Sequence, residues 1–157
     1  MDIDSRLEPI GSSLYRVAVR GIIIHSEKIL LIQEQAGPDE TWWGMPGGGI
    51  PYGESPRDVL RRMVAEQLDL PLRDVHCGVA ITWTIFGTIL NGIPRATLCY
   101  RVNVPRNDVG KGAQILARDW FTYEEVRALR ISPSIGKPID LSRLLRRLVV
   151  LGSKRKS

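Results

Sequence analysis

Two glutamates, an arginine and a run of glycines lie close together in the first half of the chain. The glycines are Gly47, Gly48 and Gly49, and they are followed by Glu54, Arg62 and Glu66. A glycine loop that leads into a helix suits an anionic ligand, because its backbone N–H groups are accessible and the helix dipole favours negative charge there. Carboxylates add groups that can hold a hard cation or move a proton. This stretch therefore indicates a binding site, and the carboxylates make it a candidate for catalysis.

The residues after the glycines predict a helix. Ser55 can cap its N-terminus, and Pro56 suits the first turn. Apolar residues then recur at helical spacing and fall mostly on one face. They are Val59, Leu60, Met63, Val64, Leu68 and Leu70. We expect a strand, a glycine loop and a helix over Thr41 to Leu70, with Glu66 and Gln67 near the mouth of the loop.

The stretch from Pro46 to Leu70 resembles the Nudix box of MutT-like hydrolases. That motif is a glycine, five residues, a glutamate, seven residues, and then Arg-Glu-apolar-x-Glu-Glu-x-Gly-apolar. The residues that match it in register, without a gap, are Gly48, Glu54, Arg62, Val64, Glu66 and Leu70. The resemblance implies an α/β protein with the Nudix fold, in which a mixed β-sheet is sandwiched between helices. It implies one domain over residues 1–157, with an N-terminal arm at 1–13 and a basic tail at 152–157.

Three positions depart from the motif. Met63 and Gln67 stand where the family has glutamates, and Asp69 stands where it has the final glycine. In the family, the helix glutamates hold Mg²⁺ or Mn²⁺. A thioether is too soft a ligand for these cations, and the Gln67 amide brings no charge. The resemblance leaves Glu66, Gln67 and a backbone carbonyl near Gly48 as metal ligands, and we expect Mg²⁺ to bind weakly or not at all without a ligand.

The resemblance also assigns roles to the remaining site residues. It implies catalytic roles for Glu66, Arg62 and Glu54, although Arg62 and Glu66 are also spaced to pair across one helical turn. The substrate-binding candidates are Gly47, Gly48, Gly49, Trp42, Trp43 and Arg20. Adjacent tryptophans on a strand face opposite ways, so one of them is expected in the core and the other at the ligand. For Arg20, a solvated strand arginine is favoured over a contact with a ligand phosphate.

No replacement base stands out in the C-terminal half. The loop from 105 to 114 contains a single acid, Asp108, and has Gln114 where an acid is sought. Some sugar-nucleotide hydrolases of the GDP-mannose type work with an altered box and a histidine base. The histidines here, His25 and His76, fall in a predicted hairpin turn and at a strand start, where ordinary surface roles are expected.

Three functions therefore stay open. The first is a Nudix-type hydrolase that acts on a nucleoside diphosphate linked to another moiety, with catalysis weak or lost. The second is a non-catalytic Nudix fold that binds a nucleotide or sugar nucleotide, or that serves as a protein-interaction module. The third is a sugar-nucleotide hydrolase of the GDP-mannose type with an altered box.

The rest of the chain predicts strands and two further helices. Thr122 is the expected cap of a short helix at 123–129, and an amphipathic helix is expected from Pro138 to about Leu151. The predicted strands are 15–24, 29–35, 42–45, 75–90, 96–104 and 115–121. Asn91-Gly92 predicts a hairpin between the fourth and fifth of these strands.

Composition bounds the remaining possibilities. The 157 residues are 43% hydrophobic and 25% charged, which fits one soluble domain. No apolar run is long enough to span a membrane, and the chain starts without the pattern of a secretory signal, so we expect a cytoplasmic protein. Two cysteines, Cys77 and Cys99, are expected to be buried free thiols rather than a disulfide.

The net charge of +5 is concentrated at the C-terminal end. Residues 137–157 include seven basic side chains and one acidic one, whereas the remainder has fifteen basic and sixteen acidic side chains. This distribution does not favour nucleic-acid binding across the domain, because the basic residues form a tail rather than a groove. The expected partner is a small molecule of nucleotide type, and a homodimer stays open.

Overall fold

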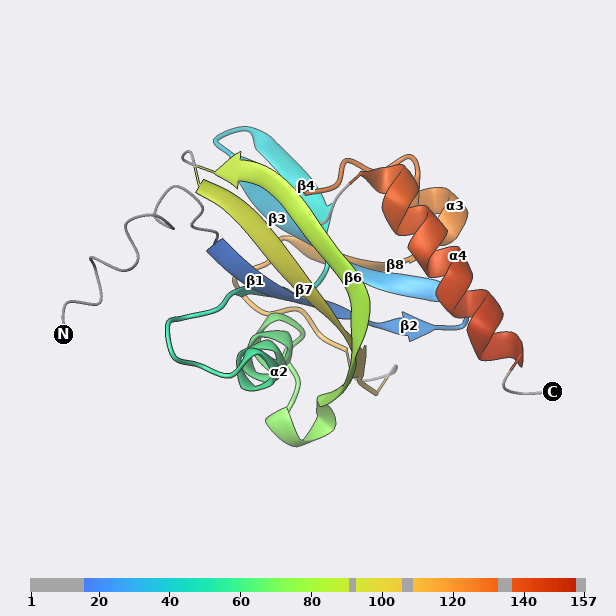
Figure 1. Cartoon of the computed structure of the whole chain (residues 1–157), viewed down its shortest axis with the longest axis horizontal. Helices are drawn as coiled ribbons and strands as arrows, with labels where there is room; N and C mark the ends of the chain where they lie inside the picture. Colours follow the sequence, from blue (N-terminus) through green and yellow to red (C-terminus); the bar gives the residue numbers. More distant parts are fainter. Residues whose placement is uncertain (1–15, 91–92, 106–108, 133–136, 155–157) are drawn as a thin grey trace, which may run out of the picture.

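The strands form two sheets in a computed structural model of the chain (Figure 1). The structure describes residues 16–90, 93–105, 109–132 and 137–154, and it describes the side chains of these residues except at 81–90, 93–94 and 151–154. The first sheet has the order β5-β1-β7-β6, and the second has the order β2-β3-β4 with β8 paired to β3. The strands are β1 (Arg16–Ile22), β2 (Ile24–His25), β3 (Lys28–Gly37), β4 (Glu40–Gly44), β5 (Gly47–Gly49), β6 (His76–Leu90), β7 (Ile93–Asn103) and β8 (Ala117–Thr122).

The pairing is mixed, as the sequence predicts for this fold. Strand β1 pairs parallel with β7 and antiparallel with β5. Strand β3 pairs antiparallel with β2, β4 and β8. A parallel pair needs a long crossover, and here it contains the box helix and strand β6.

The helices lie on both sides of the strands. Their bounds are α2 (Pro56–Gln67), α3 (Tyr123–Val126) and α4 (Pro138–Lys154), with a 3-10 turn at Leu72–Asp74. Neighbouring residues of β3 divide between two apolar clusters. Leu30 packs with the cluster of α2, whereas Leu31 packs with the cluster of α4. Since successive strand residues point to opposite faces, the strands lie between α2 on one side and α3 with α4 on the other.

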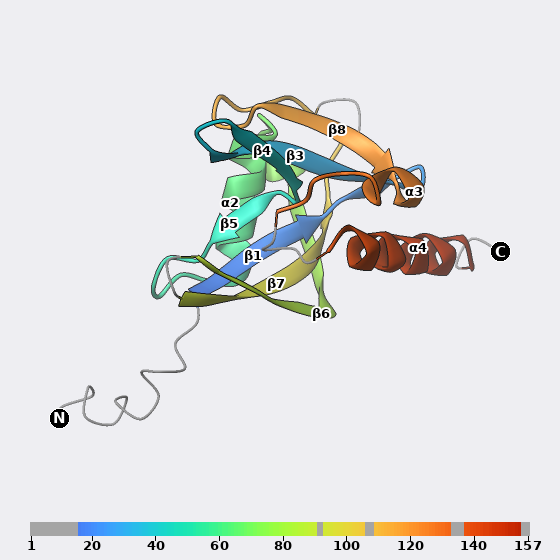
Figure 2. The ribbon, with the colours of Figure 1, turned by 90° about the horizontal axis from the view of Figure 1, so that it is seen from above.

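The predicted helix of the box is confirmed. Val59, Leu60 and Val64 are fully buried against the strands, as their spacing predicts. The glycines differ from the expected loop, because Gly47–Gly49 form the short strand β5, which Figure 2 shows beside β1 and next to α2. The close approach requires glycine at position 47: its φ is +135°, and a Cβ there would lie 2.1 Å from the Val19 carbonyl oxygen.

Most other predicted elements are present with shifted ends. The turn between β2 and β3 has its two central residues, Ser26 and Glu27, at positive φ, which is the geometry of a tight hairpin. Thr122 caps α3 in a capping box with Glu125. Helix α3 ends earlier than predicted, at Val126, and α4 extends further, to Lys154. The arm at 1–13, Asn91-Gly92 and the last three residues of the tail lie outside the described residues.

None of the helices in the described part of the chain is long and apolar enough to cross a membrane. Both cysteines are free thiols, with Cys99 buried and Cys77 partly exposed. The prediction of a buried free thiol is thus confirmed for Cys99 and holds only in part for Cys77.

Candidate functional site

The end of α2 is joined to β5 through a single side chain. The Gln67 Oε1 atom accepts a hydrogen bond from the Gly47 N–H at 2.9 Å, and Gln67 Nε2 donates to the Gly47 carbonyl at 3.0 Å. One amide thus satisfies both polar groups of one backbone residue. At this box position the family has a glutamate, whereas in this chain the side chain links helix α2 to strand β5.

Met63 fills the space beside the next glycine. Its Sδ atom would lie 2.9 Å from a Cβ built on Gly48, and the side chain packs against the apolar cluster of α2. A carboxylate at position 63 would point into the same space, so a thioether now occupies the second position that the family uses for charge.

Arg20 of β1 is hydrogen-bonded to the backbone at the start of strand β5. Its Nη1 atom donates to the Met45 carbonyl at 2.9 Å and to the Gly47 carbonyl at 3.3 Å, and it lies 3.8 Å from Glu34 Oε1. The residue is 6% exposed, so the favoured prediction of a solvated arginine is wrong. Burial lowers the pKa of its guanidinium, and the charge of Glu34 opposes that shift.

The arginine of the box pairs with a different glutamate from the one its spacing suggests. Arg62 Nη2 lies 2.9 Å from Glu54 Oε2, and both side chains are exposed. Such an exposed ion pair contributes little to stability. Among the described residues, the exposed Glu66 side chain has no hydrogen-bond or ion-pair partner. Of the two motif glutamates, Glu66 is therefore the one whose carboxylate stays available.

The donor set does not fit a tightly held Mg²⁺ or Mn²⁺. Within the described ranges, no three His, Cys, Asp or Glu side chains come together as a possible metal site. The Gly47 carbonyl, beside the predicted ligand Gly48, already accepts two N–H donors. Hard cations require several free oxygen ligands, and of the two motif glutamates Glu54 is paired with Arg62, which leaves Glu66.

The prediction that one tryptophan of β4 belongs to the core is confirmed, and the contact of the other with a ligand stays a prediction. Trp43 packs against the apolar cluster of α4, with its ring edge-on to Phe121 at a centroid distance of 4.9 Å. It is therefore the core residue of the pair. Trp42 lies opposite Glu34 of β3 and is half-buried, which leaves it as the tryptophan that can contact a ligand.

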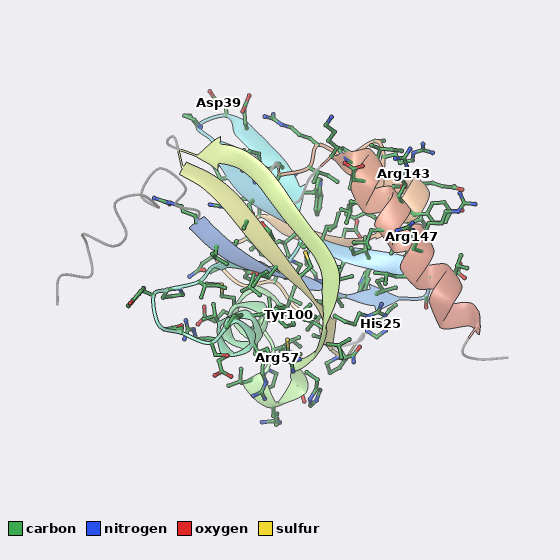
Figure 3. The ribbon with its side chains drawn as sticks, in the orientation of Figure 1. His25, Asp39, Arg57, Tyr100, Arg143 and Arg147 are labelled. Carbon is green, nitrogen blue, oxygen red and sulfur yellow. The ribbon has the colours of Figure 1, made fainter. Side chains whose placement is uncertain are left out.

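A cavity of about 600 Å³ opens beside the box loop. Its floor is largely apolar, whereas Arg16 and Arg95, which face each other across the β1–β7 pair, bring positive charge. The lining residues include Val17, Gly49, Ile50, Tyr52, Glu54 and Leu98. Nearby on the α2 side, Arg57 lies 5.5 Å from the ring centre of Tyr100 (Figure 3). The cavity has the size and the mixed lining of a small-molecule site.

The loop after β7 contacts the box helix. Gly110 N–H donates to the Leu68 carbonyl at 2.7 Å, and Gly112 N–H donates to the Gln67 carbonyl at 2.9 Å. Sequence reasoning missed this contact, because it searched the loop for acids rather than for glycines. Gln114 is exposed, and Asp108 lies outside the described residues.

The histidines are poorly placed for a base at the box. His25 Nε2 lies 3.0 Å from the Val104 carbonyl oxygen, and its ring meets Trp120 edge-on at 5.3 Å. The expectation of an ordinary surface residue is wrong for His25, which is half-buried, and it holds for the exposed His76. Neither histidine is hydrogen-bonded to the box residues in the described part of the chain.

Comparisons with known proteins agree with this fold. The family model of the NUDIX domain matches residues 14–141. A Mycobacterium tuberculosis protein described as a putative 8-oxo-dGTP diphosphatase 2 is 30% identical over 139 residues, which cover 84% of this chain and 92% of that protein. The solution structure of the E. coli ORF135 protein superposes with a TM-score of 0.65 at 21% identity, covering 91% and 95% of the two chains. A Caenorhabditis elegans Ap4A hydrolase complex superposes with a TM-score of 0.66 at 17% identity, covering 88% and 98%.

Proposed function

Because the chain belongs to the Nudix family, we propose that it binds a nucleoside diphosphate linked to a second group and hydrolyses it far more slowly than relatives with three helix glutamates. One observation carries the proposal: the Gln67 amide is committed to Gly47 through both of its polar atoms. A side chain held in this way is neutral and cannot act as a base, and its remaining oxygen lone pair is a far weaker ligand for a hard cation than a carboxylate would be.

The nucleotide class is supported by the cavity beside the box loop. Arg16 and Arg95 can pair with phosphate oxygens, and the apolar floor suits a base or a sugar face. The M. tuberculosis relative is described as an 8-oxo-dGTP diphosphatase and the C. elegans neighbour as an Ap4A hydrolase. Both names refer to nucleosides that bear a phosphate chain, and this is the ligand class that we propose here.

The remaining chemistry rests on Glu66. As the motif glutamate that pairs with no described residue, it is the group that we propose accepts a proton from water at the site. Arg62 and Glu54 are proposed to fix the entrance of the box loop through their ion pair. Because Met63 and Gln67 have no charge with which to hold a cation or accept a proton, we expect a slow reaction.

A double substitution tests the proposal. Met63→Glu with Gln67→Glu restores three carboxylates at helical positions i, i+3 and i+4. If the cavity still accepts the proposed ligand, the variant should hydrolyse at least one nucleoside diphosphate derivative about 10²- to 10⁴-fold faster than the parent. Circular dichroism confirms that each variant is folded, and adding Glu66→Gln to the double variant is the control that should remove the gain.

A second candidate function follows from the opposite result. If the double variant is folded and binds Mg²⁺ but gains no activity on any nucleotide in the panel, the proposal of a weakened hydrolase is contradicted. The commitment of Gln67 and Met63 to the fold then favours a binding or protein-interaction module. Thermal-shift screening of the parent with the same panel identifies a nucleotide that binds without being cleaved.

A further inference from the structure

We infer that Gln67, which holds strand β5 on helix α2, and Arg20, which holds it on β1, take the place of a divalent cation, so that this protein folds and binds its ligand independently of Mg²⁺ or Mn²⁺. The part of the inference that concerns ligand binding rests on the proposed function. The part that concerns folding rests on the hydrogen bonds around Gly47 alone.

The Gly47 carbonyl oxygen is the centre of the arrangement. It accepts one N–H from Gln67 Nε2 at 3.0 Å and another from Arg20 Nη1 at 3.3 Å. A carbonyl oxygen has two lone pairs, and both are used here. A cation could reach this oxygen only by displacing one of these donors, and the guanidinium charge beside it would repel the cation.

Glutamine is the side chain that this arrangement requires. Its Oε1 accepts from the Gly47 N–H while its Nε2 donates to the Gly47 carbonyl, so the reversed amide would lose both bonds. A carboxylate could still accept the N–H, but its second oxygen would face the carbonyl oxygen without a proton between them. A glutamate at position 67 therefore needs a cation there, and a glutamine does not.

Arg20 holds the backbone around Pro46 through a second, independent set of hydrogen bonds. It spans the Met45 and Gly47 carbonyls on the two sides of Pro46, and the charge of Glu34 lies 3.8 Å away. A buried charge is retained at a cost unless it is paired and hydrogen-bonded. The guanidinium thus places a permanent positive charge under the strand where a bound cation would otherwise supply one.

Thermal unfolding at mildly alkaline pH tests the folding part. The parent should unfold at the same temperature in EDTA and in millimolar Mg²⁺ or Mn²⁺. Gln67→Glu should unfold about 4–8 °C lower than the parent in EDTA and should recover part of that loss when Mg²⁺ is added. Gln35→Glu makes the same change at an exposed side chain of β3, whose amide donates to the Gly37 and Pro38 carbonyls in solvent, and it should show a smaller loss and no response to Mg²⁺.

The opposite pattern would overturn the inference. It fails if Mg²⁺ raises the unfolding temperature of the parent, or if Gln67→Glu is as stable as the parent in EDTA. If Gln67→Glu does not fold, the comparison of the parent in EDTA and Mg²⁺ still decides. Slow hydrogen exchange of the Gly47 amide in EDTA is the second expected result, and fast exchange there counts against the inference.

ADP serves as the probe for the ligand part. Its dissociation constant should be the same in EDTA and in Mg²⁺ within about twofold, whereas binding that is tenfold tighter with Mg²⁺ would contradict a cation-independent site. If ADP and the wider nucleotide panel fail to bind in either buffer, the proposed function is contradicted. The unfolding result then decides the inference about the strand by itself.

Discussion

Asp69 occupies the last position of the box, where the family motif has a glycine. Its backbone φ is +50°, in the left-handed region that L side chains rarely adopt. The geometry closes α2, because the Leu70 N–H bonds to the Ala65 carbonyl at 2.9 Å and the Asp69 N–H to the Glu66 carbonyl at 3.4 Å. This pair of bonds is the Schellman pattern, which normally uses glycine at the left-handed residue.

Replacing Asp69 with glycine should stabilise the protein. Asp69→Gly removes the left-handed strain, at the cost of a more flexible unfolded chain, and we expect a gain of about 0.5–1 kcal/mol. Urea unfolding measures the change. Asp74→Gly is the matched control, because Asp74 lies in the 3-10 turn with no positive φ, and it should lose stability instead. A destabilised Asp69→Gly would contradict the strain argument.

Cys99 should make stability depend on pH in the alkaline range. Burial raises the pKa of its thiol from 9.0 to about 12. The folded state therefore keeps a proton that the unfolded state releases, so this contribution is fully present below pH 9.0 and is lost as the pH rises towards about 12.

The Cys99→Ala variant isolates this contribution. Its unfolding free energy should fall less steeply over the alkaline range than that of the parent, as measured by urea unfolding at several pH values. Cys77→Ala is the comparison, because Cys77 is only partly buried. Equal slopes for the parent and Cys99→Ala would show that this thiol has no such role.

Some site residues could be read from the sequence, and others could not. The loss of charge at Met63 and Gln67 is visible in the box pattern itself. The new partner of Gln67 is not visible, because Gly47 lies 20 residues away and meets it only when β5 docks on α2. The sequence predicts a solvated Arg20 for the same reason, since its carbonyl partners follow 25 and 27 residues later.

The C-terminus of α2 depends on a loop that is distant in sequence. Gly112 lies so close to the helix that a Cβ there would sit 2.3 Å from the Glu66 carbonyl oxygen. Its N–H also donates to the Gln67 carbonyl. The loop that contains Gly112 thus provides partners for helix carbonyls that would otherwise lack them. It does so next to Gln67, the residue that is hydrogen-bonded to Gly47.

Gly112→Ala should loosen this contact. The added methyl must push the loop away from α2, and we expect a loss of about 1–3 kcal/mol in the free energy of unfolding. Chemical denaturation measures it. Gly37→Ala is the control, because a Cβ at Gly37 meets no atom within 4 Å. If both variants lose the same stability, the docking of the loop on the helix does not matter.

For the helices and strands, the sequence predicts their presence more accurately than their first and last residues. The box helix and the long strands follow from apolar periodicity, and the α3 cap follows from Thr122. The glycines were expected as a loop, since glycine disfavours strands on its own. Here they pair with β1 because residues without side chains allow the backbone to approach closely.

Across the whole molecule, much of the positive charge lies away from the box, on helix α4. Exposed arginines on α4, among them Arg143 and Arg147 in Figure 3, account for much of the positive charge. The box itself contributes a neutral amide and an unpaired glutamate, the side chains of Gln67 and Glu66, and the buried guanidinium of Arg20 lies beside it. The fold of the family is retained, while the charge that would gather a cation at the box is reduced.

Calorimetric titration of Mg²⁺ into the free protein tests this account most directly. The parent should show no binding tighter than about 1 mM, because Glu66 is the one glutamate that remains at the three helix positions of the motif. The variant with Met63→Glu and Gln67→Glu, titrated in parallel, should bind Mg²⁺ measurably more tightly. Tight, saturable binding of Mg²⁺ to the parent, equal to that of the variant, would contradict the claim that Gln67 and Met63 prevent tight binding of a divalent cation at the box.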